Sequence, residues 1–360
     1  MSGADGRPAR VGIAGVGGVA SYAHIPAYRR LGVSVVLLYD NAKAAIDSAT
    51  RALGRTARDA VAVTDFDELV AILPELDLDV LDVAVPSPAH HGFIAALLES
   101  AGGLCPPLLA QKPLADTRAA AGELVAAAAA AGVPLGVNVT ARWVPTFRRA
   151  RELVRAGACG EDLVASLTNR GWNPKDGVDW RSRLPRLIGF EMAVHHVDLL
   201  TWMLGPVEWV FAALRRVRGL RTAGDNVGFG TFGFASGAVA NVVEDWSCRD
   251  RAAWHFHPLA EELVVSGSQA TVVATPAELR LTTDGAVDRR LAGAKWFPDA
   301  FAGPMAEFLL ATREGRRSEI DAASHLAVLD VLEALYESSE RRSVVTLDSP
   351  VLELARATAP

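Results

Sequence analysis

The sequence predicts an α/β fold, with an N-terminal Rossmann-type doubly wound parallel sheet and a C-terminal α+β domain built on an open, mostly antiparallel sheet. Three observations support this. Up to Asn138, short apolar runs alternate with helical segments, as in a parallel sheet covered by helices. A glycine-rich turn joins the first strand to the first helix. After Asn138, successive strands are separated by turn residues, which is typical of antiparallel pairing.

The first part of the chain reads as strands connected by crossover helices. The expected strands are Val11–Ala14, Val33–Tyr39, Ala60–Val63, Val80–Val85, Leu108–Ala110 and Leu135–Asn138. The helices between them are Val19–Arg30, Ala42–Leu53, Phe66–Leu73, Ala89–Ser100 and Thr117–Ala131. This order completes a two-halved nucleotide-binding fold, so we expect an NAD-binding domain over residues 1–138.

The pattern changes in residues 139–360, which we expect to form the substrate-binding and oligomerisation domain. Helices are predicted at Pro145–Ala156 and Glu191–Leu204, with a loop rich in Trp and Arg between them. The expected strands are Phe211–Arg218, Val227–Phe234, Ala238–Trp246, Glu262–Ser266, Ala270–Ala274 and Glu278–Thr282. Two further helices, Phe301–Glu314 and His325–Glu340, precede a short run at Val344–Leu347.

Length and composition exclude several classes of protein. A chain of 360 residues exceeds what one core usually organises, so two domains are expected. The net charge of -6 is spread without a basic block, which argues against nucleic acid or a membrane as partner. No apolar leader opens the chain, and the longest apolar stretch, Leu124–Val137, is too short to cross a bilayer. The cysteines Cys105, Cys159 and Cys248 form no CxxC pair, so we expect free thiols and a cytoplasmic location.

The glycine-rich turn has the spacing of a dinucleotide-binding loop. Gly15, Gly17 and Ala20 match G-x-G-x-x-G/A, with Gly18 and Val19 between them. Gly15 permits the tight turn, Gly17 lets the backbone approach a pyrophosphate, and Ala20 lets the helix pack closely on the strand. These five residues are the expected cofactor loop.

Asp40 follows the second strand, where a carboxylate would accept hydrogen bonds from the adenosine ribose. The same charge would repel a 2'-phosphate. NAD is therefore the expected cofactor, although Lys43 and Arg51 nearby keep NADP possible. The alternative is a glycine turn with a surface Asp in a protein that binds another ligand.

Further motifs carry a family resemblance. They are Lys112-Pro113, Glu191-x-x-x-His195-x-x-Asp198, Pro86 with His90 four residues on, Arg142-x-x-Pro145, and Asp179-Trp180-Arg181. From Val11 to about Leu347 the chain resembles the glucose-fructose oxidoreductase, inositol dehydrogenase and rhizopine catabolism family, written Gfo/Idh/MocA.

The resemblance implies a site with a lysine beside the nicotinamide and an acid and a histidine on one helix. By position these are Lys112, Glu191 and His195, with Pro86 and His90 on the cofactor side. The sequence departs from the family twice, since Gln111 replaces the usual Glu and Glu191 replaces a frequent Asp. Losing the carboxylate at position 111 leaves the Lys112 ammonium less stabilised, if the two side chains approach.

The residue types support the same chemistry independently. Positions i, i+4 and i+7 share one helical face, so Glu191, His195 and Asp198 can face one cleft. Histidine suits proton transfer near neutral pH, which makes His195 the expected general base, with Lys112 polarising the oxygen and Glu191 orienting substrate or histidine. His196 and Asp198 are interpreted as structural. The sequence offers no third ligand at a suitable spacing, so we expect no metal site.

Polar and aromatic residues in expected loops form a candidate substrate surface. Trp and Arg suit a polyhydroxylated ring, which has an apolar face and a hydroxyl-rich edge. The candidates are Asn138, Arg142, Trp172, Asn173, Trp180 and Arg181.

These residues favour reversible hydride transfer between NAD and a secondary alcohol of a sugar, cyclitol or related polyol. One alternative is a glycosidase or lyase that uses NAD transiently, by oxidation and elimination. Another is a non-catalytic NAD-binding regulator, which would be expected to have lost Lys112 or His195.

A run of arginines, Leu214–Arg221, carries Arg215, Arg216, Arg218 and Arg221. We interpret it as the solvated face of a strand. An open sheet face must be covered or paired, and the family resemblance implies that this sheet supports oligomer contacts, so a homodimer or homotetramer is expected.

Overall fold

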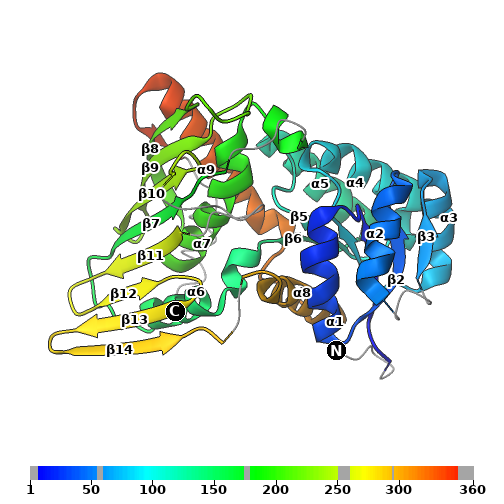
Figure 1. The fold of residues 1–360 in the computed structure, drawn as a ribbon, viewed down its shortest axis with the longest axis horizontal. Helices are drawn as coiled ribbons and strands as arrows, with labels where there is room; N and C mark the ends of the chain where they lie inside the picture. Colours follow the sequence, from blue (N-terminus) through cyan, green and yellow to red (C-terminus); the bar gives the residue numbers. More distant parts are fainter. Residues whose placement is uncertain (1–6, 55–59, 174–178, 250–259, 294–295, 348–360) are drawn as a thin grey trace. The chain divides into compact units, whose positions relative to one another are not determined.

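The computed structural model describes residues 7–54, 60–173, 179–249, 260–293 and 296–347 (Figure 1). The chain divides into two compact units. Unit 1 comprises Met1–Trp143 and Trp296–Leu326, and unit 2 comprises Val144–Lys295 and Ala327–Pro360. The domain limits 1–138 and 139–360 stay a prediction. The structure adds that the segment Trp296–Leu326 packs with the N-terminal unit.

Unit 1 contains a six-stranded parallel sheet in the order β3-β2-β1-β4-β5-β6. The strands are β1 (Arg10–Ala14), β2 (Ser34–Tyr39), β3 (Val61–Val63), β4 (Val80–Val83), β5 (Leu108–Gln111) and β6 (Leu135–Asn138). Apart from the edge strand β3, where Val61 and Ala62 are exposed, their residues are almost all buried, as expected of a parallel sheet covered on both faces. The Rossmann-type prediction is confirmed.

The connecting helices of unit 1 follow the predicted order. A π-helical turn, Ala20–His24, leads into α1 (Ile25–Leu31). The others are α2 (Lys43–Leu53), α3 (Phe66–Leu76), α4 (Ser87–Ala101) and α5 (Arg118–Ala131). Asp65 caps α3 by accepting from two backbone amides, and Thr117 caps α5 in the same way with one.

Helix α8 (Ala302–Glu314) lies beside α1 in unit 1 (Figure 1). Its Phe308 ring packs against Gly136 of β6, where an added Cβ would stand 2.7 Å from the ring. A larger residue at position 136 would displace the helix, so this glycine provides the space in which α8 packs. The sequence prediction assigned the helix to the C-terminal domain because chain order gives no sign of this return.

Unit 2 contains a nine-stranded sheet in the order β14-β13-β12-β11-β7-β10-β9-β8-β15. The strands are β7 (Val164–Arg170), β8 (Val207–Arg215), β9 (Val227–Phe234), β10 (Val239–Asp245), β11 (Ala260–Ser266), β12 (Thr271–Ala274), β13 (Glu278–Thr283), β14 (Ala286–Leu291) and β15 (Val345–Thr346). Every pairing is antiparallel except β7 with β10. The mostly antiparallel sheet is confirmed.

Two strands of this sheet were missed by the sequence prediction. Strand β7 was taken for loop because Ser166, Thr168 and Asn169 interrupt its apolar pattern, although every second residue is buried. Strand β14 is exposed along its whole length and so carries no burial signal. The expected strand Phe211–Arg218 is wrong at its C-terminal end, because β8 stops at Arg215.

Helices α6 (Pro145–Arg155), α7 (Val194–Leu204) and α9 (Ala322–Arg341) complete the fold. Helix α9 hydrogen-bonds to β8, since the backbone amides of Ala212 and Leu214 donate to Ser338 and Ser339. Within the described ranges, none of the helices has the length and apolar character needed to cross a membrane.

Candidate cofactor and catalytic sites

The glycine loop joins β1 to the following helix with little space for side chains. Gly15 has a φ of 90°, and a Cβ there would stand 2.4 Å from the backbone nitrogen of Val85. Gly17 and Gly18 are exposed, and a Cβ at Gly17 would meet no atom within 4 Å. Gly15 is thus required by the fold, whereas Gly17 leaves open space beside the chain. That arrangement fits a pyrophosphate approaching the backbone.

The helix starts within this loop. Gly18 and Val19 are already helical, and Ala20 is buried at the start of the π-helical turn. The amides of a first helical turn have no partner within the helix, so they are available to an anion. The five residues predicted as the cofactor loop therefore form one continuous strand–turn–helix segment.

Asp40 follows β2 and holds the glycine loop in place. Its Oδ2 accepts from the Val16 amide at 3.0 Å, and its Oδ1 accepts from the Ala42 amide at 2.9 Å. Each carboxylate oxygen can accept a further hydrogen bond, so these contacts are compatible with ribose hydroxyls. Lys43 forms an exposed ion pair with Asp47 at 3.2 Å.

Lys112 directly follows β5, and its peptide bond to Pro113 is cis. The buried His90 supports this segment, because its Nδ1 lies 2.9 Å from the carbonyl oxygen of Pro113 and its Nε2 lies 2.8 Å from that of Val85. Pro86 precedes the first turn of α4. The cofactor contact expected of His90 stays a prediction, and its observed contacts position the main chain beside Lys112.

Gln111 and Asn138 end neighbouring strands and are paired in register. The Nε2 of Gln111 and both side-chain polar atoms of Asn138 are buried without a hydrogen-bond partner. An unsatisfied buried polar group costs about 1–3 kcal/mol. Ligands of open α/β sheets bind at the carboxyl ends of strands, so these amides suit a polar group of the cofactor or substrate.

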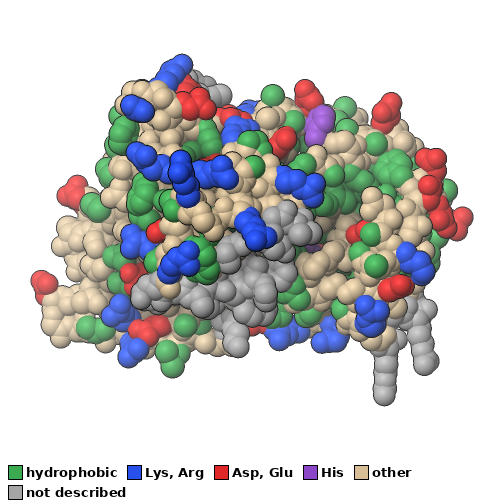
Figure 2. Space-filling view, turned by 45° about the horizontal axis from the view of Figure 1, so that its top comes forward, with side chains coloured by type: hydrophobic (Ala, Val, Ile, Leu, Met, Phe, Trp, Pro, Cys, Tyr) green, Lys and Arg blue, Asp and Glu red, His purple; other side chains and the backbone are tan. Residues whose placement is uncertain are grey.

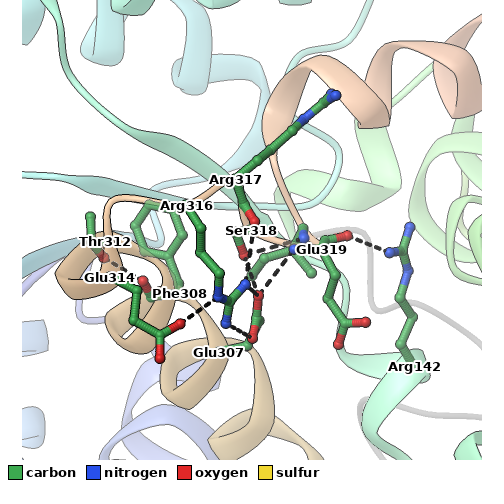
Figure 3. A network of polar contacts seen from close by, with 10 residues as sticks. Arg142, Glu307, Phe308, Thr312, Glu314, Arg316, Arg317, Ser318 and Glu319 are labelled. Atoms are coloured by element: carbon green, nitrogen blue, oxygen red, sulfur yellow. Dashed lines mark hydrogen bonds and ion pairs between the residues drawn. The ribbon is translucent and has the colours of Figure 1, made fainter. Parts of the chain in front are cut away.

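Arg142, predicted as a substrate residue, is largely buried in a 3₁₀ turn after β6. Its Nη1 donates to the carbonyl oxygen of Glu319 at 2.6 Å. Figure 3 shows this contact beside a network in which Glu307 binds Arg316 through both carboxylate oxygens and accepts from the Ser318 hydroxyl. Arg142 thus supports the segment after α8, and the substrate contact stays a prediction.

Glu191 and His195 lie on one continuous helical stretch of unit 2. Glu191 belongs to a π-helical turn, Gly189–Ala193, which leads directly into α7 and His195. Only 8% of Glu191 and 9% of His195 is exposed. Single π-turns inside helices are rare and frequent at functional sites.

Arg181 forms an ion pair with Glu191, its Nε donating to Oε2 at 3.1 Å. The same guanidinium contacts Asp179 and stacks 4.4 Å from the Trp180 ring centroid. Burial alone would lower the pKa of Arg181, but Glu191 and Asp179 together raise it. Arg181, predicted to touch substrate, thus holds the Glu191 carboxylate, which favours orientation over proton transfer as the role of Glu191.

His196 is fully buried between two carboxylates. Its Nδ1 contacts Glu244 of β10 and its Nε2 contacts Glu261 of β11. Burial lowers the pKa of His196, but the two carboxylates outweigh it and raise the value to about 10. Burial raises the pKa of Glu244, which His196 partly offsets. The imidazolium therefore joins α7 to two strands of the sheet.

Sequence reasoning missed both acids, although a signal was present. In β10 the side chains of Ala240, Val242 and Glu244 alternate onto the buried face. A carboxylate at an inward position of a strand needs a buried partner. The adjacent histidines on the predicted helix were the available candidates.

The remaining candidates also lie in unit 2. Trp172 pairs its main chain with Ser247 and packs against a buried cluster of Leu187, Ile188, Met192, Leu220 and Trp246. Asn173 is buried, with its Nδ2 unpartnered. Among the residues that the structure describes, no three His, Cys, Asp or Glu side chains are grouped to bind a metal.

Comparison with known proteins places this geometry in context. The family model described as an oxidoreductase family with an NAD-binding Rossmann fold matches residues 9–139, and the GFO/IDH/MocA C-terminal domain matches residues 147–273. D-apiose dehydrogenase of Paraburkholderia graminis is 29% identical, over 95% of this chain and 91% of the relative. D-xylose 1-dehydrogenase (NADP(+)) 2 of Haloferax volcanii is 25% identical, over 94% and 99%. The structure of levoglucosan dehydrogenase in complex with NADH and levoglucosan superposes with a TM-score of 0.80 at 18% identity, over 95% of this chain and all of that one.

Replacing Asp40 tests the cofactor site. Asp40→Ala should weaken NAD binding about tenfold or more, because charge-assisted hydrogen bonds of about 1.5–3 kcal/mol are lost. The advantage of NAD over NADP should narrow with the loss of the repulsive charge. Titration of both cofactors measures this, with Asp47→Asn as a surface control. An unchanged ratio of NAD affinity to NADP affinity would show that Asp40 does not take part in cofactor binding.

The His196 contacts predict a pH-dependent stability. Because the folded pKa of about 10 exceeds the ordinary value of 6.5, the protonated form stabilises the fold fully below pH 6.5, and this contribution disappears as the pH rises towards 10. His196→Gln should lower the free energy of unfolding by about 3–5 kcal/mol below pH 6.5.

Denaturant unfolding across this pH range measures the difference, with His91→Gln, at a partly exposed histidine, as control. A difference between wild type and His196→Gln that stays constant from pH 6 to 10 would contradict the charged state of His196.

Proposed function

Because the chain belongs to the Gfo/Idh/MocA family of NAD-dependent oxidoreductases, we propose that it transfers a hydride between NAD and a secondary alcohol or ketone of a sugar, cyclitol or related polyol. One observation carries the proposal. A complete glycine loop with Asp40 occurs together with Lys112 and with the Glu191–His195 helix. A regulator without catalysis would have no need of the last three residues.

Each side chain has one role in the proposed reaction. His195 accepts the hydroxyl proton, as a positioned imidazole can near neutral pH. Lys112 stabilises the negative charge that develops on the oxygen. Glu191, held by Arg181, orients the substrate hydroxyls. NAD, when bound, supplies the hydride acceptor at C4 of the nicotinamide.

The substrate class is proposed from the relatives and from the side chains. The two curated relatives are named for the sugars apiose and xylose. A sugar presents an apolar ring face and hydroxyl edges, which suit aromatic rings and amides. Asn138, Arg142, Trp172, Trp180 and Arg181 are the proposed substrate residues, with Arg142 and Arg181 acting through the contacts described above.

We also propose a homodimer or homotetramer. Phe211 of β8 and Phe229 of β9 are 45% and 46% exposed on the sheet of unit 2. Two large aromatic side chains on neighbouring strands are suited to burial against a second subunit. The three cysteines are free, which supports a reducing compartment such as the cytoplasm.

Incubating the protein with NAD and a panel of aldoses, inositols, glycosides, sugar phosphates and uronates tests the function. The proposal predicts net formation of NADH with at least one sugar or cyclitol. Release of an aglycone without net NADH would assign oxidation–elimination instead. If NAD binds but no member of the panel reacts in either direction, the substrate class is wrong.

Lys112→Met and His195→Ala should each lower the turnover number about 100-fold or more, because each removes a positioned acid, base or charge-stabilising group. NADH affinity should change little. His91→Ala, at a partly exposed histidine, serves as the matched control. Near-normal turnover in either variant, measured per folded molecule, would exclude that residue from catalysis.

The double variant, Lys112→Met with His195→Ala, tests whether the two side chains act in one transition state. If they do, the fold decrease in turnover number of the double variant should be far smaller than the product of the two single decreases. Multiplicative losses would mean that Lys112 and His195 act independently.

A further inference from the structure

The segment between β8 and β9, residues 216–226, carries most of the arginine run identified in the sequence. Arg216, Arg218 and Arg221 are exposed there. The interpretation of the run as a strand face is wrong beyond Arg215, because the chain leaves the sheet at that residue. The arginines beyond Arg215 therefore project from a loop and not from a strand face.

Buried anchors hold this loop in one conformation. The fully buried Asn226 accepts from the Val217 amide at 2.9 Å and donates to the Val217 carbonyl at 3.1 Å. Leu220 inserts into the cluster formed by Leu187, Ile188, Met192 and Trp246. A loop fixed in this way presents charged side chains at a lower entropic cost than a mobile loop.

The loop packs against the turn that carries Arg181. The Ala223 amide donates to the Ser182 carbonyl at 2.7 Å, within the 3₁₀ turn Trp180–Arg183. Arg181 of this turn contacts Glu191, and Arg183 is exposed on it. The loop and the proposed catalytic helix are thus joined through a single turn of chain.

A further arginine lies beside the loop 216–226. Arg249 stacks on Trp172 at 3.6 Å, and its Nη2 lies 4.0 Å from the position of a Cβ on Gly219 of the loop. We call Arg183, Arg216, Arg218, Arg221 and Arg249 the arginine patch. Figure 2 shows Lys and Arg side chains gathered over the part of unit 2 that carries β8 to β10.

The carboxylate of the loop does not neutralise the patch. Asp225 accepts from the amides of Leu187 and Ile188 and from the Tyr336 hydroxyl. Among the described residues, Arg183, Arg216 and Arg218 make no ion pair. Local positive charge in a chain of net charge -6 attracts anions selectively.

We propose that the arginine patch binds an oxyanion group of the substrate, so that the enzyme acts on a sugar bearing a phosphoryl or carboxylate group. Guanidinium groups bind both oxyanions through paired hydrogen bonds. The link through Arg181 and Glu191 associates such a group with the proposed site of oxidation. The inference rests on the proposed function and adds the charge of the substrate to it.

Calorimetric binding to the NADH complex tests the patch without requiring turnover. The probes are glucose, glucose 6-phosphate and glucuronate, which separate a neutral sugar, a phosphoryl group and a carboxylate. Wild type should bind at least one anionic probe more tightly than glucose. Arg216→Gln combined with Arg218→Gln should weaken that binding about tenfold or more and leave glucose unaffected.

The matched control is Arg289→Gln with Arg290→Gln on β14, two exposed arginines paired with Glu278 and Asp288. These changes remove the same charge from the protein at another place and should leave binding unchanged. Added salt should weaken binding of the anion in wild type more than in the patch variant.

Equal binding of all three probes by wild type would overturn the proposal, as would equal losses in the patch and control variants. A change of oligomeric state in the patch variant with unaltered anion binding would assign the arginines to a subunit interface and also overturn it. If anion binding depends on the patch but no sugar reduces NAD, the proposed function fails while the anion site stands.

Discussion

The burial of ionisable side chains on one helix is the constraint on which unit 2 depends. Glu191, His195, His196 and Asp198 lie within eight consecutive positions and are all at least nine-tenths buried. Buried charges are tolerated only when they are paired and hydrogen-bonded. The sheet and the turn before the helix must therefore supply Glu244, Glu261 and Arg181, and these partners fix where the helix lies.

In unit 1, the position of polar residues along the strands is the organising feature. The sheet is largely apolar. Apart from the buried Asp82 of β4, which contacts His24 and Tyr28, its polar residues occur mainly where the parallel strands end. Gly15, Asp40, Gln111 and Asn138 follow or end β1, β2, β5 and β6 in turn. Because one edge of the sheet gathers all four strand ends, residues far apart in sequence lie at the edge where open α/β sheets bind ligands. The residues proposed to bind the cofactor thus share that edge of the sheet.

Local patterns were sufficient to predict the Rossmann-type sheet, the glycine loop and the helix that carries His195. They failed where the determining contact is distant in the sequence. Strand β7 has a weak apolar pattern because its pairing with β10 and β11 supplies its stability. Arg142 and Arg181 were expected at the substrate from their charge, and nothing in the sequence indicated that they also contact Glu319 and Glu191. Charge alone could not show whether an arginine faces a ligand or another part of the chain.

Direct hydride transfer is the central claim, and isotopic labelling tests it most directly. The protein is incubated with NAD and a reactive sugar deuterated at the carbinol carbon, and the reduced cofactor is analysed by mass spectrometry. The account predicts that the NADH formed carries the deuterium, since the hydride passes from carbon to C4 without exchange with water. Reduced cofactor without deuterium, or product formed with no reduced cofactor, would contradict it.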